Sequence, residues 1–328
     1  MLAFILRRVL QSVAVLLVVA FIAFGLFNFT GDPVSLMLGQ QATTEERIQL
    51  RADLGIDRPF YVQFAKFVNN AVHGNFGLSL RQGRPVSALL LERLPATLEL
   101  SIAAAFLAIS IGIPAGVYTA LRRNSLSAQI LLAISLVGVS LPVFLIGILL
   151  ILVFAVQLGW LPSFGRGETV ALGWWTTGFL TASGWKSLIL PAITLSFFQM
   201  TLIMRLVRSE MLEVLRTDYV KFARARGLSD RAIHFGHALK NTLVPVITII
   251  GLQLGAIIAF ALVTETVFQW PGMGLLFIQA VYFADIPVMA AYLCFIALVF
   301  VIINLTVDLL YYAVDPRLRI EAGAGAGH

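Results

Sequence analysis

The amino-acid sequence predicts an all-α, polytopic membrane protein, and three observations support this fold class. Of the 328 residues, 59% are apolar and only 12% are charged, whereas soluble domains average about half apolar and a quarter charged. The mean hydropathy is +0.92. Several apolar runs reach the ~20 residues that a helix needs to cross the bilayer core. These features exclude an ordinary soluble enzyme, a disordered chain and, with a single cysteine at Cys294, a disulfide-stapled secreted domain.

Six apolar stretches predict six transmembrane helices. The first follows Arg7 and Arg8 and lacks the small-residue cleavage site of a signal peptide, so we interpret it as an uncleaved span. The third is longer than a span requires and must tilt, kink at Pro142 or protrude; Pro114, Pro191 and Pro245 also predict kinks. The six stretches are Val9–Phe29, Thr97–Leu121, Ala128–Gln157, Ser187–Met204, Leu243–Val263 and Val288–Tyr312.

Lysine and arginine gather at one set of span ends, which the positive-inside rule assigns to the cytoplasm. We therefore interpret the net charge of +6 as a determinant of membrane orientation rather than as a sign of nucleic-acid binding. The opposite short connections carry only Arg166 and Lys186, and six spans place both termini in the cytoplasm. The residues on the basic side are Arg7, Arg8, Arg122, Arg123, Arg205, Arg208, Arg216, Lys221, Arg224, Arg226, Arg231, Lys240, Arg317 and Arg319.

The spans divide the chain into four parts. Within the long external segment, Thr43–Glu46 opens a helix-like stretch with a hydroxyl cap, and a second helix follows Pro59 with Phe60, Phe64 and Phe67 on one apolar face. We interpret this segment as a docking surface, a gate cover or a structural cap on the bundle. The parts are an N-terminal transmembrane helix (1–29), the external segment (30–95), a membrane core (96–312) that includes a cytoplasmic loop (205–242), and a cytoplasmic tail (313–328).

The cytoplasmic loop predicts a compact helical projection. Asp218 is placed to cap a short helix over Tyr219–Arg226, Gly227 supplies a left-handed C-terminal position, and Ser229 is placed to cap a second helix. A helix of about two turns is unstable alone in water, so a groove on another protein would hold it. The alternatives are a basic loop that sets topology or contacts anionic lipid, and a DNA-binding helix-turn-helix, for which the rest of the domain is missing.

At this loop the sequence strongly resembles the inner-membrane permeases of ABC importers, of the dipeptide, oligopeptide and nickel type, in their B-type subunit. The resemblance extends over nearly the whole chain up to about Arg319. The pieces that carry it are Arg208-Ser-Glu-Met-Leu-Glu-Val-Leu, Asp218-Tyr-Val-Lys-Phe-Ala-Arg-Ala-Arg-Gly-Leu, His237-Ala-Leu-Lys-Asn-Thr-Leu-Val-Pro-Val-Ile-Thr, Gly31-Asp-Pro33, His73-Gly-Asn-Phe-Gly-Leu-Ser79, Thr97-Leu-Glu-Leu100, Thr264-Glu-Thr-Val-Phe-Gln-Trp-Pro-Gly272, Val307-Asp-Leu-Leu-Tyr311 and Asp315-Pro-Arg317.

The resemblance implies a type-1 importer permease fold and a coupling loop that docks on an ATPase subunit. In the family motif E-A-A-x-x-x-G, the second alanine corresponds to Ala223 and the glycine to Gly227, while Lys221 and Phe222 replace the first two positions. The residues expected to couple to the ATPase are Asp218, Tyr219, Ala223, Arg224, Ala225, Arg226, Gly227 and Leu228.

The resemblance also implies partners: a second permease subunit, giving a heterodimer, two ATP-binding subunits and an external solute-binding protein, all in a bacterial inner membrane. The sequence has no G-x-x-x-x-G-K-[ST] phosphate loop. We therefore expect a non-enzymatic chain without cofactor or metal, with ATP used by the partners. The expected cargo is a short peptide, and glutathione or nickel remains the alternative.

Charged and aromatic residues beside the spans are candidates for the substrate pathway or for receptor contact. Glu99 and Glu265 lie at outer span ends, and Trp270 follows the fifth span. Charges within hydrocarbon are expensive and often functional, but a structural hydrogen bond would also explain both carboxyl groups. Gly112-x-x-x-Gly116 and Gly251-x-x-x-Gly255 predict close helix packing within the chain or at a subunit interface.

Two other classes of protein remain open from the residues alone. An ion-coupled secondary transporter would usually carry internal repeats with paired broken helices, and no convincing repeat occurs. A membrane enzyme would need an acid, base, nucleophile or metal set. His234 and His237 share a helical spacing, but their neighbours are basic, which favours a solvated surface.

Overall fold

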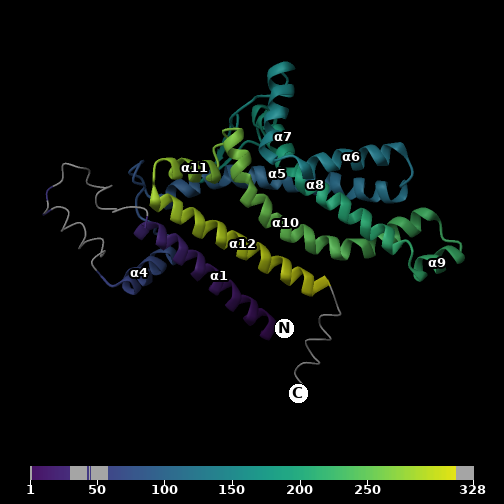
Figure 1. Cartoon of the computed structure of the whole chain (residues 1–328), viewed down its shortest axis with the longest axis horizontal. Helices are drawn as coiled ribbons and strands as arrows, with labels where there is room; N and C mark the ends of the chain where they lie inside the picture. The colour runs from purple at the N-terminus through teal and green to yellow at the C-terminus, as the bar shows by residue number, and fades with distance from the viewer. Residues whose placement is uncertain (1, 30–42, 44, 46–57, 315–328) are drawn as a thin grey trace. The chain divides into compact units, whose positions relative to one another are not determined.

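The computed structural model describes residues 2–29, 43, 45 and 58–314, and this part of the chain is mostly helical (Figure 1). A single two-stranded antiparallel sheet pairs Val170 with Thr177 among the described residues. The elements in order are α1 (Leu2–Phe29), α4 (Phe60–Val72), α5 (Val86–Leu121), α6 (Leu126–Ser140), α7 (Val143–Leu150), η1 (Ile151–Gln157), β1 (Val170–Leu172), β2 (Trp175–Thr177), α8 (Ala182–Val214), α9 (Asp218–Ala225), η2 (Ala232–Ala238), α10 (Leu239–Val267), α11 (Met273–Tyr282) and α12 (Ile286–Val314).

Five helices in the described part of the chain are long and apolar enough to cross a membrane: α1, α5, α8, α10 and α12. The predicted third span is a broken pair, because α6 and the α7–η1 helix are bent by 114°. The break falls at Pro142, where proline removes a backbone donor and the preceding Leu141 adopts an extended conformation. The pair brings the number of spans to six if it is counted as one.

Three other prolines do not interrupt their helices. Pro114 lies inside α5, Pro191 inside α8 and Pro245 inside α10. The helix predicted at Thr43–Glu46 falls on a segment that the structure describes only at Thr43 and Glu45, and most of the predicted tail lies outside the described residues.

The chain divides into two compact units. The first comprises Ala96–Trp270 and the chain from Ile303, and in it α8 packs against α6, α7 and α10. Two apolar cores lie toward opposite ends of α8: one contains Leu100, Leu195 and Trp270, and the other contains Val207 and Met211.

Glycines allow close helix packing inside the first unit. A Cβ atom on Gly112 would lie 3.0 Å from the backbone oxygen of Met200, and one on Gly116 would lie 2.7 Å from that of Met204. A Cβ on Gly251 would meet the side chain of Val307. Contacts within one chain therefore explain Gly112, Gly116 and Gly251, as the intrachain interpretation of both glycine patterns predicts.

The second unit comprises Leu2–Pro95 and Pro271–Ile302. In it, the Asp285 carboxylate between α11 and α12 accepts a hydrogen bond from the Ser79 hydroxyl. The same carboxylate accepts the backbone N–H groups of Leu80 at 3.1 Å and Arg81 at 3.3 Å. One buried side chain thus fixes the turn that precedes α5 against the junction of two helices.

Candidate functional site

The first candidate site is the projection formed by α9 and its flanking turns, between α8 and η2. The predicted boundaries differ from the observed ones by one residue: Thr217 is the N-cap and Asp218 is the first helical residue. The Thr217 hydroxyl donates to the carbonyl of Val214 at 2.6 Å instead of capping α9. Asp218 pairs with the Lys221 ammonium at 2.8 Å, and this hydrogen bond lowers the pKa of the Asp218 carboxyl.

The C-terminus of α9 confirms the predicted glycine corner. Gly227 has φ +79°, in the left-handed region. Its N–H donates to the carbonyl of Arg224 at 2.9 Å, and the N–H of Leu228 donates to the carbonyl of Ala223 at 3.3 Å. This pair of bonds is a Schellman motif, which satisfies the last helical carbonyls only when a residue with positive φ follows the helix.

The projection has a small apolar core of its own. Val220 and Ala223 from α9 pack against Ile233 from η2, and Leu215 and Leu228 close the cluster. Ala223 and Leu228, two of the residues predicted to couple to an ATPase, therefore face inward or sit at the edge of this core. A small residue at position 223 lets η2 approach α9 closely.

The outward surface of the projection is aromatic and basic. Phe222 is 65% exposed and Tyr219 is 41% exposed, and the guanidinium of Arg226 lies 5.8 Å from the centroid of the Phe222 ring. Arg224 and Ala225 are also exposed. The structure thus separates the predicted residues into a group that packs inside the projection and a group that is exposed on its surface.

The projection is continuous with α10. Ser229 caps the next helix as predicted, with its hydroxyl oxygen 3.4 Å from the N–H of Ala232. That helix passes through the π-helical turn η2 directly into α10. The amide Nδ2 of Asn241 in α10 donates to the hydroxyl of Tyr219 at 2.7 Å.

The second candidate site surrounds residues 96–99, near the start of α5. The three pathway candidates Glu99, Glu265 and Trp270 meet there, although 166 residues separate Glu99 from Glu265 in the sequence. The Trp270 indole N–H donates to the carbonyl of Ala96 at 2.8 Å. The Thr97 hydroxyl donates to Glu265 Oε1 at 2.6 Å. All three candidates are buried.

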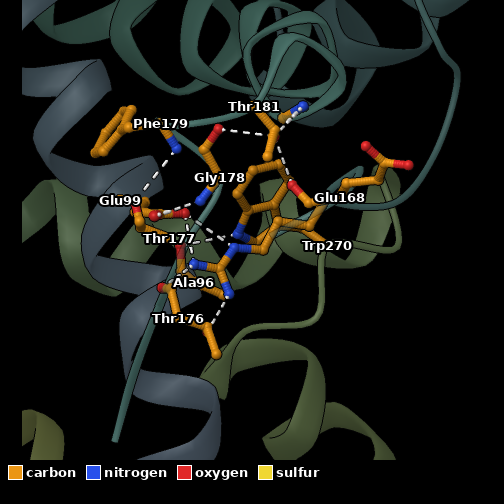
Figure 2. A network of polar contacts seen from close by, with 11 residues as sticks. Ala96, Glu99, Glu168, Thr176, Thr177, Gly178, Phe179, Thr181 and Trp270 are labelled. Carbon is orange, nitrogen blue, oxygen red and sulfur yellow. Dashed lines mark hydrogen bonds and ion pairs between the residues drawn. The ribbon is translucent and has the colours of Figure 1, made fainter. Parts of the chain in front are cut away.

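Glu99, which Figure 2 labels together with Thr176 and Gly178, forms a buried ion pair with Arg166, from the segment that precedes β1. Arg166 Nε and Nη2 lie 2.9 Å and 2.6 Å from Glu99 Oε2. The other carboxylate oxygen accepts the N–H of Gly178 at 2.9 Å. The remaining guanidinium donors reach the hydroxyl and carbonyl oxygens of Thr176 at 3.0 Å and 2.7 Å. The network therefore closes the loop that carries the hairpin onto α5.

Glycine at position 167 makes this closure possible. Gly167 has φ +73°, and a Cβ there would lie 2.7 Å from the backbone carbonyl of Ser183. Both the left-handed conformation and the close approach exclude a larger residue. Arg166 was not predicted as a site residue. The available signal was its position as a rare basic residue on the side of the spans that is otherwise poor in positive charge.

At the second site each buried charge has an oppositely charged or hydrogen-bonding partner, which is how folded proteins hold charges that they use for structure. Among the described residues, no group of three His, Cys, Asp or Glu side chains could hold a metal ion. Of the two histidines that were expected on a solvated surface, His237 is exposed and His234 is half-buried in η2.

Comparisons with known proteins agree with this arrangement of spans. Two family models match the chain: "binding-protein-dependent transport system inner membrane component" over residues 112–320, and the N-terminal part of the same membrane component over residues 1–101. The dipeptide transport system permease protein DppB of Alkalihalophilus pseudofirmus is 39% identical over 97% of this chain and all of the relative.

Two further relatives cover the chain to a similar extent. The di/tripeptide transport system permease protein DppB of Pseudomonas aeruginosa is 40% identical over 97% of this chain and 99% of the relative. The glutathione transport system permease protein GsiC of Escherichia coli is 36% identical over 98% of this chain and all of the relative.

The fold also matches solved structures. An inward-facing form of the MetNI methionine ABC transporter superposes with a TM-score of 0.55 at 20% identity, over 69% of this chain and 96% of that one. At this identity the match establishes the fold alone, and it agrees with the type-1 importer permease fold that the sequence predicts. The chain is a multi-pass membrane protein that belongs to the family of inner-membrane components of binding-protein-dependent transport systems.

Proposed function

We propose that this chain is one permease subunit of an ATP-driven importer of short peptides, and that α9 is its coupling helix. The observation that carries the coupling proposal is the exposed aromatic pair Tyr219 and Phe222 on a short, internally packed helix between two long apolar helices. The packing of α9 on Ile233 supplies the support that a two-turn helix needs, so its exposed rings are left for contact with another protein. Aromatic side chains are the residues that most often anchor such interfaces.

The contacts of α9 support transmission of movement into the spans. Tyr219 is hydrogen-bonded to Asn241 in α10, and Val220 and Ala223 pack on Ile233 in η2. At its other end α9 follows α8 after a turn of three residues, and Leu215 in that turn joins the same apolar cluster. A displacement of α9 would therefore be transmitted to α8 and α10 through packed side chains rather than through a flexible loop.

The partners and the orientation follow from the same proposal. Two ATP-binding subunits would receive the coupling helices of this chain and of a second permease subunit, and an external solute-binding protein would deliver the cargo. The projection and both termini would lie in the cytoplasm, which places Arg224, Arg226 and Arg231 on the side that the positive-inside rule requires. ATP would be bound and hydrolysed by the partner subunits.

Peptides are the cargo that the similar proteins favour, since two of them are named for dipeptide and di/tripeptide transport. Glutathione is the second candidate because a permease named for its transport is 36% identical over 98% of this chain. Glutathione is itself a tripeptide, so both candidates belong to one chemical class. We expect the external binding protein, rather than this chain, to select between dipeptides and glutathione.

A crosslinking experiment tests the coupling proposal. The single cysteine is replaced (Cys294→Ala), Phe222→Cys is introduced, and membranes that contain the whole transporter are labelled with a benzophenone maleimide and irradiated during uptake, so that the probe at position 222 inserts into a C–H bond of the protein beside it. We expect a crosslink to an ATP-binding subunit. Trp174→Cys, on a residue that is 70% exposed near the hairpin at the other end of α8, is the matched control and should give none. Absence of the Phe222→Cys crosslink in an actively transporting complex would refute the assignment.

Truncation of the same side chain measures its contribution. Loss of a central aromatic anchor typically costs about 2 kcal/mol or more, which corresponds to roughly a 30-fold weaker association. We therefore expect Phe222→Ala to reduce peptide uptake by an order of magnitude while membrane insertion of the chain is unchanged. Normal uptake by Phe222→Ala would show that α9 does not dock through this ring.

A further inference from the structure

The helix α4 crosses α1 and packs on it through phenylalanine rings. Phe60, Phe64 and Phe67 of α4 lie with ring centroids 5.1–5.8 Å from those of Phe21 and Phe24 in α1. This confirms the apolar face that the sequence predicts for α4. Three successive turns of α4 meet a single turn of α1, so α4 runs across α1 rather than along it, beside the end of α1 remote from the N-terminus (Figure 1).

The position of these rings along α1 fixes the depth of the contact in the membrane. The candidate span of α1 is Leu6–Leu26, and the apolar run that follows Arg7 and Arg8 extends to Phe29. At 1.5 Å per residue, Phe24 lies about 3–8 Å and Phe21 about 8–12 Å inside the end of the apolar run. Because α4 packs on both rings, it lies in the interfacial region of one leaflet whichever way α1 is oriented.

The apolar surface of α4 is wider than the part that α1 covers. A second stripe at positions i, i+4, i+7 and i+11 runs along one flank of the Phe stripe. Its first and last residues, Tyr61 and Val72, are 73% and 78% exposed. The stripe consists of Tyr61, Ala65, Val68 and Val72. The polar residues gather on the other flank, and they are Gln63, Lys66, Asn69 and Asn70.

We propose that α4 is an interfacial membrane helix whose second stripe contacts lipid. Membrane lipid is the occupant that the geometry favours, because α1, the span on which α4 packs, is itself apolar and exposed at Val18 and Ile22. A helix with one apolar and one polar flank at the hydrocarbon edge lies in the plane of the interface, with its apolar side at the acyl boundary. Tyrosine is enriched at this level because its ring is apolar and its hydroxyl is polar.

Lipid contact by α4 goes beyond the transport proposal and does not depend on it. It requires only that α1 crosses the bilayer. Its consequence is that the segment between the first two spans is held on the membrane surface at this helix, so an external partner can approach only the polar flank.

Spin-label accessibility tests the proposal on the full-length chain in liposomes of phosphatidylethanolamine and phosphatidylglycerol, with any subunits that co-purify. In a Cys294→Ala background, nitroxides are attached to Tyr61→Cys and Val72→Cys on the lipid flank, and to Lys66→Cys and Asn69→Cys on the polar flank. Leu10→Cys, on a residue that is 61% exposed in α1, is the lipid-facing control.

The measurement compares collisions with oxygen, which concentrates in lipid, and with a water-soluble nickel chelate. We expect oxygen collisions to exceed chelate collisions at positions 61 and 72, as at position 10, and the reverse at positions 66 and 69. Chelate-dominated collisions at 61 and 72 would place the stripe in water, and weak collisions with both reagents would place it under protein. Either result would overturn the proposal, even if transport is normal.

Discussion

Replacing Arg166 by methionine tests whether the Glu99–Arg166 pair stabilises the fold. Methionine keeps an unbranched apolar stem but removes the guanidinium, which donates two hydrogen bonds to Glu99 and two to Thr176. The Glu99 carboxylate would stay buried with the N–H of Gly178 as its remaining partner in this network. Removing one member of a buried ion pair typically costs about 3–5 kcal/mol, because the other charge is left uncompensated. We expect Arg166→Met to lower the free energy of unfolding by about this amount.

The assay is equilibrium unfolding of the purified chain in mixed micelles, followed by circular dichroism as the fraction of dodecyl sulfate rises. The matched control is Arg84→Met, which removes the same group from an ion pair of similar length. Arg84 Nη2 lies 2.9 Å from Glu92 Oε2, but these side chains are 53% and 51% exposed. Exposed ion pairs contribute about 0–1 kcal/mol to stability, so Arg84→Met should change the free energy of unfolding only slightly.

The double variant separates the lost pair from the orphaned charge. Glu99→Gln combined with Arg166→Met removes both charges of this pair, and the glutamine still offers an oxygen to the N–H of Gly178. We expect the double variant to be more stable than Arg166→Met alone. If Arg166→Met and Arg84→Met lowered the free energy of unfolding equally, the structural role of the Glu99–Arg166 pair would be refuted. Unchanged stability with lost uptake would instead assign Glu99 and Arg166 to the substrate pathway.

Three further substitutions test other features of the structure. Gly227→Val should strain the left-handed corner by about 1–2 kcal/mol and reduce uptake in a complex that still assembles, measured with labelled peptide. Gly116→Val should lower the unfolding free energy by about 1–3 kcal/mol or more, because the new side chain would overlap Val207. Asp285→Asn should weaken charge-assisted bonds of about 1.5–3 kcal/mol and accelerate tryptic cleavage after Arg81, measured by mass spectrometry.

Controls for these substitutions come from the same chain. Gly236→Val adds the same side chain at a glycine without positive φ and with no atom within 4 Å of the new Cβ, so it should preserve both uptake and stability. Glu92→Gln neutralises an exposed carboxylate and should leave cleavage unchanged. Normal uptake by Gly227→Val, normal stability of Gly116→Val, or unchanged proteolysis of Asp285→Asn would each contradict its prediction.

The parts of the fold that were predictable from the sequence are governed by local physical chemistry. Span positions follow from hydropathy, since a bilayer core requires about 20 apolar residues. The corner after α9 follows from Gly227, because the adjacent residues can satisfy the last carbonyls only through a left-handed position. The cap of α9 was misplaced by one residue because Thr217 and Asp218 are both good N-cap residues, and the choice depends on the bond from the Thr217 hydroxyl to Val214.

The remaining features depend on contacts between distant residues. Glu99 was a candidate by its charge alone, but its partner Arg166 is 67 residues away, and no local pattern connects them. Pro142 predicted a kink, whereas the 114° bend depends on how α6 and α7 pack against α8. The π-helical turns η1 and η2 have no sequence signature comparable to a cap or a proline.

The two candidate sites share α10, so this helix could transmit a movement from one site to the other. Asn241 near its start is bonded to Tyr219 of the projection, and Glu265 near its end is bonded to Thr97 of α5. The 24 residue steps from Asn241 to Glu265 span roughly 36 Å of helix. A helix transmits a displacement along its axis only if each end is attached to a neighbouring element. Both ends of α10 are attached by hydrogen bonds, one to α9 and the other to α5. A shift of α9 would therefore reach Thr97, about three turns into α5, through one continuous helix, without a chain of side-chain contacts across the bilayer.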